Sequence, residues 1–387
     1  MIVVGAGPAG TECAQRLAAG GFQVMVVEEH ARPGEPVHCT GVLSAQAYRA
    51  FELPQSAIQS ELTVAELVSP GGITLRVPLN GSHAYAVDRG EVDRALAARA
   101  EQAGARFCFQ TRVTALATGD RGVTVSGRRL GEPWEERARV VVLATGARSR
   151  LPQQAGMAGV HEDCHGAQMQ VRVESPPVIR VWLGQRVAPG GFGWAVPAGP
   201  GWSRVGVLTR GQPRGALAAV ARRALPEGAG MDPEAVRLHP IPAAPRRPTF
   251  GERALSVGDA AGQVKMTTGG GVYYGLLASR IACEVLAERL AQERLGARHL
   301  ARYERLWQEL LGPEQRAGQL LRRIACELPD DSLDEVFRLA EARGLSRYVL
   351  DLVDFDWHAG PAVGLALTVL SATPEERGLR WLKRLLS

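Results

Sequence analysis

The chain has 387 residues, of which 45% are hydrophobic, enough for two domains or more. Its net charge is +5, and its basic residues are almost all arginines, because Lys265 and Lys383 are the two lysines. No basic cluster with interleaved aromatic residues is evident, so we expect no nucleic-acid partner. No apolar run reaches the roughly 20 residues that cross a bilayer. We also expect no signal peptide and a cytoplasmic protein, with membrane association left open.

The first segment predicts a strand, a glycine-rich turn, a helix and a second strand. Residues 2–4 form a short buried strand, and residues 11–19 form a helix that ends at Gly20 and Gly21. Residues 22–27 are an unbroken apolar run, which is typical of a parallel strand. This arrangement is half of a dinucleotide-binding fold.

A Gly-x-Gly-x-x-Gly pattern joins that first strand to its helix. Its three glycines permit a tight turn, a close approach of the backbone to a pyrophosphate, and close packing of helix and strand. The helix N-terminus offers unpaired N–H groups to the phosphate. An acidic residue after the next strand is expected to bind the ribose hydroxyls, and Glu28 is preferred over Glu29. The predicted nucleotide site comprises Gly5, Gly7, Pro8, Ala9, Gly10, Glu28 and Glu29.

The middle of the chain predicts a second, strand-rich unit. Residues 62–87 alternate in polarity around a Pro-Gly-Gly turn, which predicts a hairpin outside the nucleotide sheet. A helix is expected at residues 91–102, followed by strands between residues 105 and 144. Four further strands, at residues 168–174, 178–183, 193–196 and 203–209, predict an antiparallel sheet.

A second glycine-rich segment begins after another apolar strand and runs from Gly258 to Gly271. One nucleotide fold needs both segments only if a single long cofactor spans them, and FAD is such a cofactor. Asp259 is expected to accept a hydrogen bond from the ribityl chain, or else to cap the next helix. The three glycines 269–271 let the backbone lie against a flat ring, and the following helix directs its positive end toward a reduced, negatively charged flavin. The alternative for these glycines is a flexible loop.

These elements predict an α/β fold: a Rossmann-like FAD-binding domain with an inserted antiparallel β-sheet substrate domain and a C-terminal helical region. The expected FAD-binding domain comprises residues 1–61, 88–150 and 250–300. Residues 62–87 and 151–249 form the expected substrate-binding domain, and residues 301–387 the helical region.

Four segments together resemble the geranylgeranyl reductase family, within the p-hydroxybenzoate hydroxylase superfamily of flavoproteins. They are residues 258–274, residues 87–89 with Asp93, residues 39–44, and the aromatic-x-Trp-x-x-Pro stretch 192–197 with Val205-Gly206. The resemblance covers residues 1 to about 300. It implies FAD-dependent reduction of carbon–carbon double bonds in isoprenoid chains such as prenyl diphosphates, prenyl lipids or menaquinone tails. The expected electron donor is NAD(P)H or a ferredoxin-like protein.

The resemblance also implies roles for single residues. Cys39 becomes a candidate catalytic group beside the flavin, with a packing residue or an inert thiol as alternatives. Phe192 and Trp194 are expected to line an apolar substrate cavity, or else to pair within a sheet core. The remaining cofactor residues are Cys39, Thr40, Gly41, Arg89, Val113, Thr145, Gly146, Gly258, Asp259, Gly269, Gly270, Gly271 and Val272, and the substrate residues are Phe192, Trp194, Pro197 and Tyr273.

Two departures from the family patterns stand out. Thr145 replaces an aspartate that the superfamily's hydroxylases use with FAD and NADPH, which weakens a hydroxylase interpretation. Lys265 and Met266 stand where many family members have Asn-Pro; we expect Lys265 to face solvent rather than to place charge near the flavin. We likewise expect His38 to be a surface residue rather than a proton shuttle.

The sequence therefore predicts an FAD-dependent isoprenoid reductase. The alternatives are a flavin-dependent aromatic monooxygenase and a non-enzymatic flavin or lipid carrier. The six cysteines show no metal-binding spacing and are expected to be free thiols. The basic, amphipathic segment 377–386 suggests peripheral membrane contact, or a helix docked on its own protein.

Overall fold

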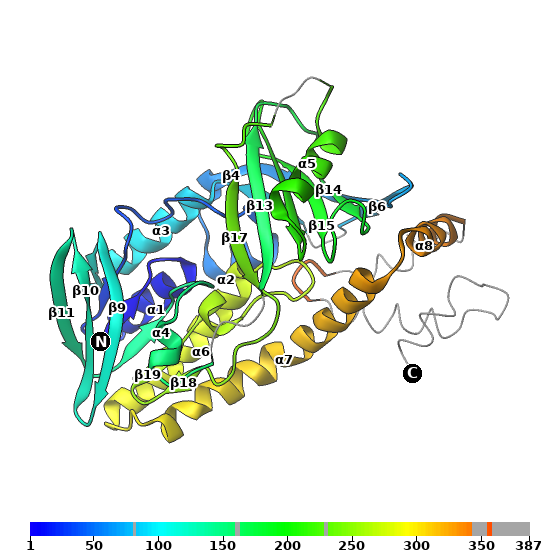
Figure 1. Ribbon diagram of the computed structural model, residues 1–387. Helices are drawn as coiled ribbons and strands as arrows, with labels where there is room; N and C mark the ends of the chain where they lie inside the picture. The colour runs from blue at the N-terminus through cyan, green and yellow to red at the C-terminus, as the bar shows by residue number, and fades with distance from the viewer. Residues whose placement is uncertain (80–82, 159–162, 228–230, 343–353, 358–387) are drawn as a thin grey trace.

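The computed structural model describes residues 1–387 except 80–82, 159–162, 228–230, 343–353 and 358–387. Its nucleotide-fold part is built on a six-stranded sheet with the order β18-β19-β12-β1-β2-β8 (Figure 1). All neighbours are parallel except β18 and β19. The strands are β1 (Ile2–Val4), β2 (Met25–Val27), β8 (Arg106–Cys108), β12 (Val141–Leu143), β18 (Phe250–Gly251) and β19 (Ala254–Ser256).

Helices α1 (Pro8–Ala19), α3 (Arg89–Gln102) and α6 (Val272–Ala291) belong to the same unit. Their buried faces share one apolar core with β1 and β2. Helix α1 begins three residues earlier than predicted, because the fixed φ of Pro8 suits the first turn of a helix. Strand β2 is shorter than the apolar run 22–27 from which it was predicted. The expected Rossmann-like parallel sheet is confirmed.

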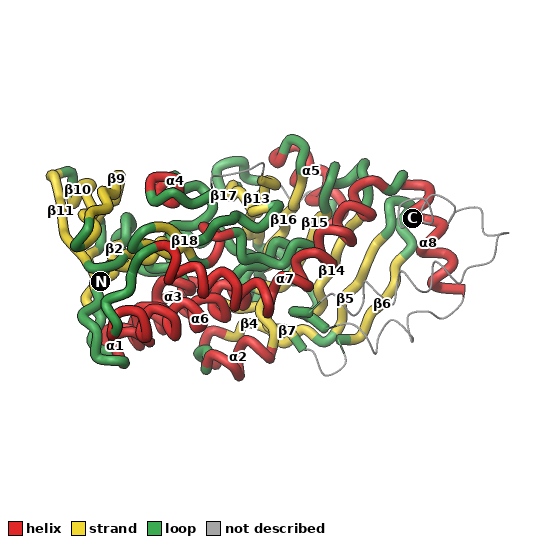
Figure 2. Tube along the Cα trace, turned by 90° about the horizontal axis from the view of Figure 1, so that it is seen from below, coloured by secondary structure: helices red, strands yellow, loops and turns green. Residues whose placement is uncertain are grey.

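A three-stranded antiparallel sheet lies at one end of the molecule (Figures 1 and 2). It consists of β9 (Thr111–Gly119), β10 (Gly122–Arg129) and β11 (Glu132–Ala138). Val113, Val123 and Val125 of this sheet pack with Ile2 and Val4 of β1, so it covers part of the parallel sheet. The strands predicted between residues 105 and 144 are these three together with β8 and β12.

The second large sheet has seven strands in the order β17-β13-β16-β15-β14-β5-β6. Helix α5 (Pro213–Ala224) packs on one face, where Val220 lies beside Gly193. The four predicted strands are present, the first of them displaced toward the N-terminus, whereas α5 and β17 had no predicted counterpart. The strands are β5 (Val64–Val68), β6 (Thr74–Pro78), β13 (Asp163–Val171), β14 (Val178–Leu183), β15 (Phe192–Pro197), β16 (Ser203–Thr209) and β17 (Arg237–Pro242).

Another small sheet includes the strand that follows the Cys39 segment. It has the order β3-β7-β4, with β3 at Val42–Ser44, β7 at Ala84–Val87 and β4 at Ile58–Leu62. Helix α2 (Ala45–Phe51) follows β3 directly, and Ser44 caps it by accepting a hydrogen bond from the N–H of Ala47. The predicted hairpin is thus β5–β6, whereas β7 pairs elsewhere.

The C-terminal region is helical in its described part up to Ala342. Helix α7 (Ala297–Glu327) runs from beside β18 and β19 toward the seven-stranded sheet, where α8 (Asp330–Ala342) follows (Figures 1 and 2). Asp334 of α8 accepts hydrogen bonds from Ser69 Oγ and Gly71 N–H in the β5–β6 turn. In the part of the chain that is described, no helix is long and apolar enough to span a bilayer. The predicted amphipathic segment 377–386 lies outside the described residues.

Candidate functional site

The two glycine-rich segments, far apart in sequence, lie side by side. A Cβ built on Gly258 would be 3.1 Å from the Cβ of Ala9. The hydroxyl of Ser279 on α6 donates to the carbonyl of Ala9 at 2.9 Å. The N-termini of α1 and α6 therefore border the same place, as one cofactor spanning both segments requires.

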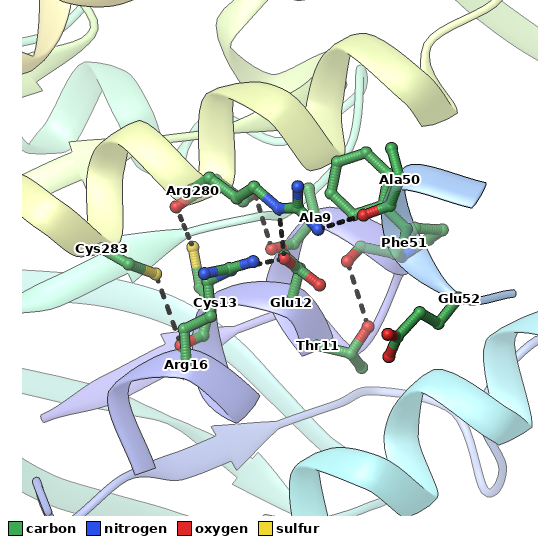
Figure 3. A network of polar contacts seen from close by, with 12 residues as sticks. Ala9, Thr11, Glu12, Cys13, Arg16, Ala50, Phe51, Glu52, Arg280 and Cys283 are labelled. Atoms are coloured by element: carbon green, nitrogen blue, oxygen red, sulfur yellow. Dashed lines mark hydrogen bonds and ion pairs between the residues drawn. The ribbon is translucent and has the colours of Figure 1, made fainter. Parts of the chain in front are cut away.

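A polar network holds α1 against α6 (Figure 3). Glu12 on α1 is 3% exposed and accepts from Arg16 at 2.6 Å and from Arg280 of α6 at 3.2 Å. The Arg280 guanidinium also lies 3.8 Å from the centre of the Phe51 ring. Moving either arginine away would leave the buried Glu12 carboxylate with less compensation for its charge, which is costly. The network fixes the relative position of the two glycine-rich segments.

The first segment has the tight geometry that its three glycines predict. Gly5 has a φ of +104°, and a Cβ there would lie 2.3 Å from the carbonyl oxygen of Ala144. A Cβ on Gly10 would lie 2.0 Å from the carbonyl oxygen of Gly5. A Cβ on Gly7, in contrast, would meet no protein atom within 4 Å. Gly5 and Gly10 thus serve packing, whereas Gly7 faces open space at the N-cap of α1, the place where a pyrophosphate would bind.

Glu28 and Glu29 occupy different environments after β2. The side chain of Glu28 is 12% exposed, and it accepts from Ala6 N–H at 2.7 Å and His30 N–H at 2.9 Å. Glu29 is half exposed and forms an ion pair with Arg112 at 3.6 Å. Glu28 therefore lies directly beside the glycine turn, which agrees with its preference as the ribose ligand.

The second segment surrounds the carboxylate of Asp259. A Cβ on Gly271 would lie 2.4 Å from Asp259 Oδ1, so only glycine fits opposite that carboxylate. Asp259 Oδ2 lies 3.9 Å from His239 Nε2, on β17 of the seven-stranded sheet. Helix α6 has Gly271 as its N-cap, without a side-chain cap. The carboxylate is 31% exposed and retains acceptor capacity for a ligand.

The expectation that Lys265 faces solvent is wrong. Its side chain is 7% exposed, and its ammonium forms an ion pair with Asp356 at 3.0 Å and donates to the carbonyl of Phe355. It also lies 4.3 Å from the centre of the Phe355 ring. Lysine is rarely buried without a partner, and this partner, 91 positions further on, cannot be found from local spacing.

Several residues that sequence reasoning missed hold the second segment in place. Gln263 accepts from Gly258 N–H at 2.8 Å and donates to the hydroxyl of Tyr303 on α7. Gln315, also on α7, donates to the carbonyl of Gly262 at 2.8 Å. Arg246 is 3% exposed and donates to the carbonyls of Ala147 and Asp259. These residues share a buried polar side chain, and that burial can be seen only in the folded structure.

The Cys39 segment is held by residues of the substrate sheet. Arg204 on β16 is 8% exposed and donates to the carbonyls of Thr40 at 2.7 Å and Val87 at 2.9 Å. Thr40 Oγ1 in turn donates to Gln168 on β13 at 3.1 Å. A Cβ on Gly41 would lie 2.6 Å from the carbonyl oxygen of Val87. Arg204, which carried no sequence signal, thus couples the seven-stranded sheet to this segment.

Two arginines dominate the charge around Cys39. Arg89 is buried and pairs with Asp93 at 2.8 Å. Burial opposes its charge, but Asp93 and Cys39 outweigh burial and raise the pKa of Arg89 above its ordinary value. Burial lowers the pKa of Arg204, which Cys39 partly offsets. Cys39 itself is partly exposed and lies near both of these cations.

Buried polar atoms near these segments have no protein partner among the described residues. Among them are Arg89 Nε, Thr145 Oγ1 and His38 Nδ1. His38 is half-buried and stacks on His239 with ring centres 5.4 Å apart, so its expected surface position is only partly correct. Burial and the neighbouring His239 lower the pKa of His38. Unpaired buried polar atoms are rare, and here they suit a ligand rich in oxygen and nitrogen such as FAD.

The predicted substrate residues separate into two groups. Phe192 and Trp194 lie 5.7 Å apart on the face of β15 opposite α5. A Cβ on Gly206 would lie 2.2 Å from the Trp194 ring, so Gly206 makes room for the indole. Tyr273 instead contacts Phe51 and Trp357.

The other predicted positions are also defined. Burial, followed by the charge of Asp356, raises the pKa of Tyr273 to about 12. Pro197 ends β15 and is buried. Gly146 has a positive φ, and a Cβ there would meet no atom within 4 Å. The side chain of Val113 is part of the core under the parallel sheet. Contact of Val113 with a cofactor would therefore involve its backbone.

The sequence and fold of this chain are similar to those of several known proteins. Residues 1–177 match the model of the pyridine nucleotide-disulphide oxidoreductase family. Digeranylgeranylglycerophospholipid reductase 2 of Methanopyrus kandleri is 32% identical over 90% of this chain and 92% of its own length. Digeranylgeranylglycerophospholipid reductase 1 of Methanococcoides burtonii is 30% identical over 92% of this chain and 90% of its own.

Two solved structures show how widely the fold is shared. A geranylgeranyl bacteriochlorophyll reductase-like protein from Thermoplasma acidophilum superposes with a TM-score of 0.83 at 22% identity, over 99% of this chain and 98% of its own. A flavin-dependent brominase superposes with a TM-score of 0.70 at 17% identity, over 95% of this chain and 97% of its own. At these identities the likeness shows the fold alone.

Proposed function

Because the chain belongs to the geranylgeranyl reductase family of flavoproteins, we propose that it reduces carbon–carbon double bonds in the isoprenoid chains of a lipid. The observation that carries this proposal is the 32% identity, over nine-tenths of the chain, with an enzyme named for reducing a digeranylgeranylglycerophospholipid. An aromatic monooxygenase is not favoured, because the relatives at about 30% identity are named reductases.

FAD is the proposed cofactor, and it supplies the reducing equivalents when bound. Gly7 and the N-terminus of α1 would receive its pyrophosphate, and Glu28 its adenosine ribose. Asp259 would accept from the ribityl chain, and the backbone of residues 269–271 would lie against the ring. We assign the cofactor to residues 1–61, 88–150 and 250–300, and the substrate to residues 62–87 and 151–249.

The protein's own contribution to the reaction is positioning, exclusion of water and proton supply. Phe192 and Trp194 present an apolar surface for the isoprenoid chain, where each buried CH₂ contributes about 0.8 kcal/mol. Cys39 is the proposed proton-handling group, since its thiol lies in the segment that Arg204 fixes and interacts with Arg89. An apolar, closed surface around a double bond also keeps water from the reacting carbons.

The test is anaerobic incubation of the dithionite-reduced protein with a digeranylgeranylglycerophospholipid, followed by mass spectrometry. A gain of about 2 Da per reduced bond is expected, because each reduction adds two hydrogens. Oxidised protein is the first control. Cys39→Ser is the second, and it should retain FAD binding while losing most of its turnover. Flavin-loaded protein that reduces no isoprenoid lipid, or gives only oxygenated products in air, contradicts the proposal.

The electron donor and the place of reaction are also proposals. We propose a nicotinamide nucleotide or a ferredoxin-like protein as donor, and anaerobic bleaching of the flavin by each candidate identifies it.

Because the proposed substrate is a lipid, we propose contact with a membrane surface. Co-sedimentation with lipid vesicles tests that contact, and protein that stays in the supernatant at low salt contradicts it.

A further inference from the structure

Asp356 is a buried carboxylate that the proposed reaction does not use. It is 1% exposed, Ser44 donates a hydrogen bond to its Oδ2, and Lys265 pairs with its Oδ1 at 3.0 Å. Burying either charge alone is costly, so each compensates the other. The result is a neutral pair that contains a full positive and a full negative charge.

The lysine of this pair is part of the loop proposed to carry the flavin ring. Its N–H donates to the carbonyl of Gly270 at 3.0 Å, and its carbonyl accepts from Gly269 N–H at 2.8 Å. A Cβ on Gly270 would lie 2.8 Å from Lys265 Cε, so the lysine side chain lies against that glycine. Lys265 therefore supports the loop 269–271 with both its backbone and its side chain.

The aspartate arrives from a distant part of the chain and is held beside α6. The hydroxyl of Tyr274, in the first turn of α6, donates to the carbonyl of Asp356 at 2.8 Å. Asp354 Oδ1 accepts from the N–H groups of Asp356 and Trp357, which closes a turn around the carboxylate. The Trp357 ring then packs on Tyr274, with ring centres 5.8 Å apart.

We propose that Lys265 and Asp356 act as a positioning pair that sets the reduction potential of the bound flavin. The pair holds the loop 269–271 in place, and Asp356 compensates the charge of the Lys265 ammonium that lies against that loop. This inference rests on the proposed FAD site. It assigns a role to a lysine at a position where many family members have asparagine.

The test compares the affinities of reduced and oxidised FAD, measured through the reduction potential at about pH 6. Asp356→Asn leaves the Lys265 ammonium uncompensated, which favours the anionic reduced flavin. We expect its preference for reduced over oxidised FAD to rise about tenfold, because an uncompensated charge in a largely buried site acts at an effective dielectric constant of about 20 rather than that of water. For a two-electron couple, tenfold corresponds to about 30 mV. The double variant Lys265→Met with Asp356→Asn is neutral again and should return to the wild-type value.

A matched control is Glu327→Gln, which breaks the exposed Arg323–Glu327 pair on α7 and should leave the potential unchanged. If Asp356→Asn leaves the potential unchanged, or if the double variant keeps the shift, the proposal is overturned. Equal loss of FAD affinity in the single and double variants would assign the pair a purely structural role and also overturn it. If the variants show these shifts but FAD-loaded wild type reduces no lipid, the proposed function alone is refuted. Wild type that binds no FAD refutes both proposals.

Discussion

Gly7→Ala separates cofactor binding from folding more cleanly than any other change in the glycine turn. Gly7 has φ −71° and ψ 175°, which alanine adopts without strain, and its added methyl group would meet no protein atom within 4 Å. The folded protein without cofactor should therefore tolerate the change. A pyrophosphate that approaches the N-terminus of α1 would meet that methyl group directly.

The magnitude follows from the contacts at this helix end. Glycine is a better N-cap than alanine, so the unfolding free energy of the apoprotein should fall by no more than about 1 kcal/mol. Losing one charge-assisted hydrogen bond from a backbone N–H to the pyrophosphate costs about 1.5–3 kcal/mol. We therefore expect the Kd for FAD to rise about 10- to 100-fold. Gly10→Ala should behave differently, because its Cβ would lie 2.0 Å from the Gly5 carbonyl oxygen and would unfold or distort the apoprotein itself.

The assay is fluorescence titration of the apoprotein with FAD, together with thermal unfolding of the apoprotein. Gly215→Ala on α5 is the control, since a Cβ there also meets no atom within 4 Å and lies in another part of the fold. It should leave the Kd for FAD at the wild-type value. If Gly7→Ala binds FAD as tightly as Gly215→Ala, the cofactor does not approach Gly7 and the assignment of this turn is wrong.

Three other substitutions test the remaining parts of the site. Gly206→Ala should displace the Trp194 indole, because the ring lies 2.2 Å from the position of the new Cβ. The KM for the isoprenoid substrate should therefore rise in steady-state kinetics, whereas flavin titration should show little change in FAD affinity. Arg204→Met should leave the carbonyls of Thr40 and Val87 without this donor. The unfolding free energy, measured by urea titration, should fall by about 2–4 kcal/mol. An unchanged urea midpoint would contradict the role of Arg204 in holding the Cys39 segment. Burial opposes ionisation of Asp334, but the hydrogen bonds from Ser69 and Gly71 lower its pKa. Its stabilising effect should thus be present above about pH 4 and disappear as the pH falls through the lower folded-state pKa. The Tm difference between wild type and Asp334→Asn, followed from pH 7 to 3, should shrink on acidification.

The predictable part of the site is the part whose geometry is local. Gly5 and Gly10 could be assigned to tight packing because a strand, a turn and a helix follow one another within a few residues. Glu28 could be preferred over Glu29 from its spacing, 23 positions after Gly5, and its carboxylate does lie beside the glycine turn. In such cases the sequence neighbours are also the spatial neighbours, so spacing carries the information.

The rest of the site could not be predicted because its contacts are distant in sequence. Lys265 is buried only because Asp356 reaches it from the C-terminal region. Arg204 on β16 acts on Thr40, 164 positions away, in the loop before β3. The sequence around a lysine or arginine does not show whether the side chain is solvated or paired within a core. Because most lysines and arginines are exposed, a surface position is the better expectation until the fold is known.

The fold by itself does not select the chemistry, because this chain superposes both on a reductase-like protein and on a brominase. The choice must then lie in the side chains around the proposed flavin site. Lys265 is the sole lysine of the first 382 residues, and its ammonium is occupied by a carboxylate and a carbonyl. The Cys39 segment, in contrast, is held by Arg204 yet leaves its thiol partly exposed. Chemistry that needs a free lysine is therefore unavailable at Lys265, whereas delivery of reducing equivalents and a proton to an apolar chain requires no such group.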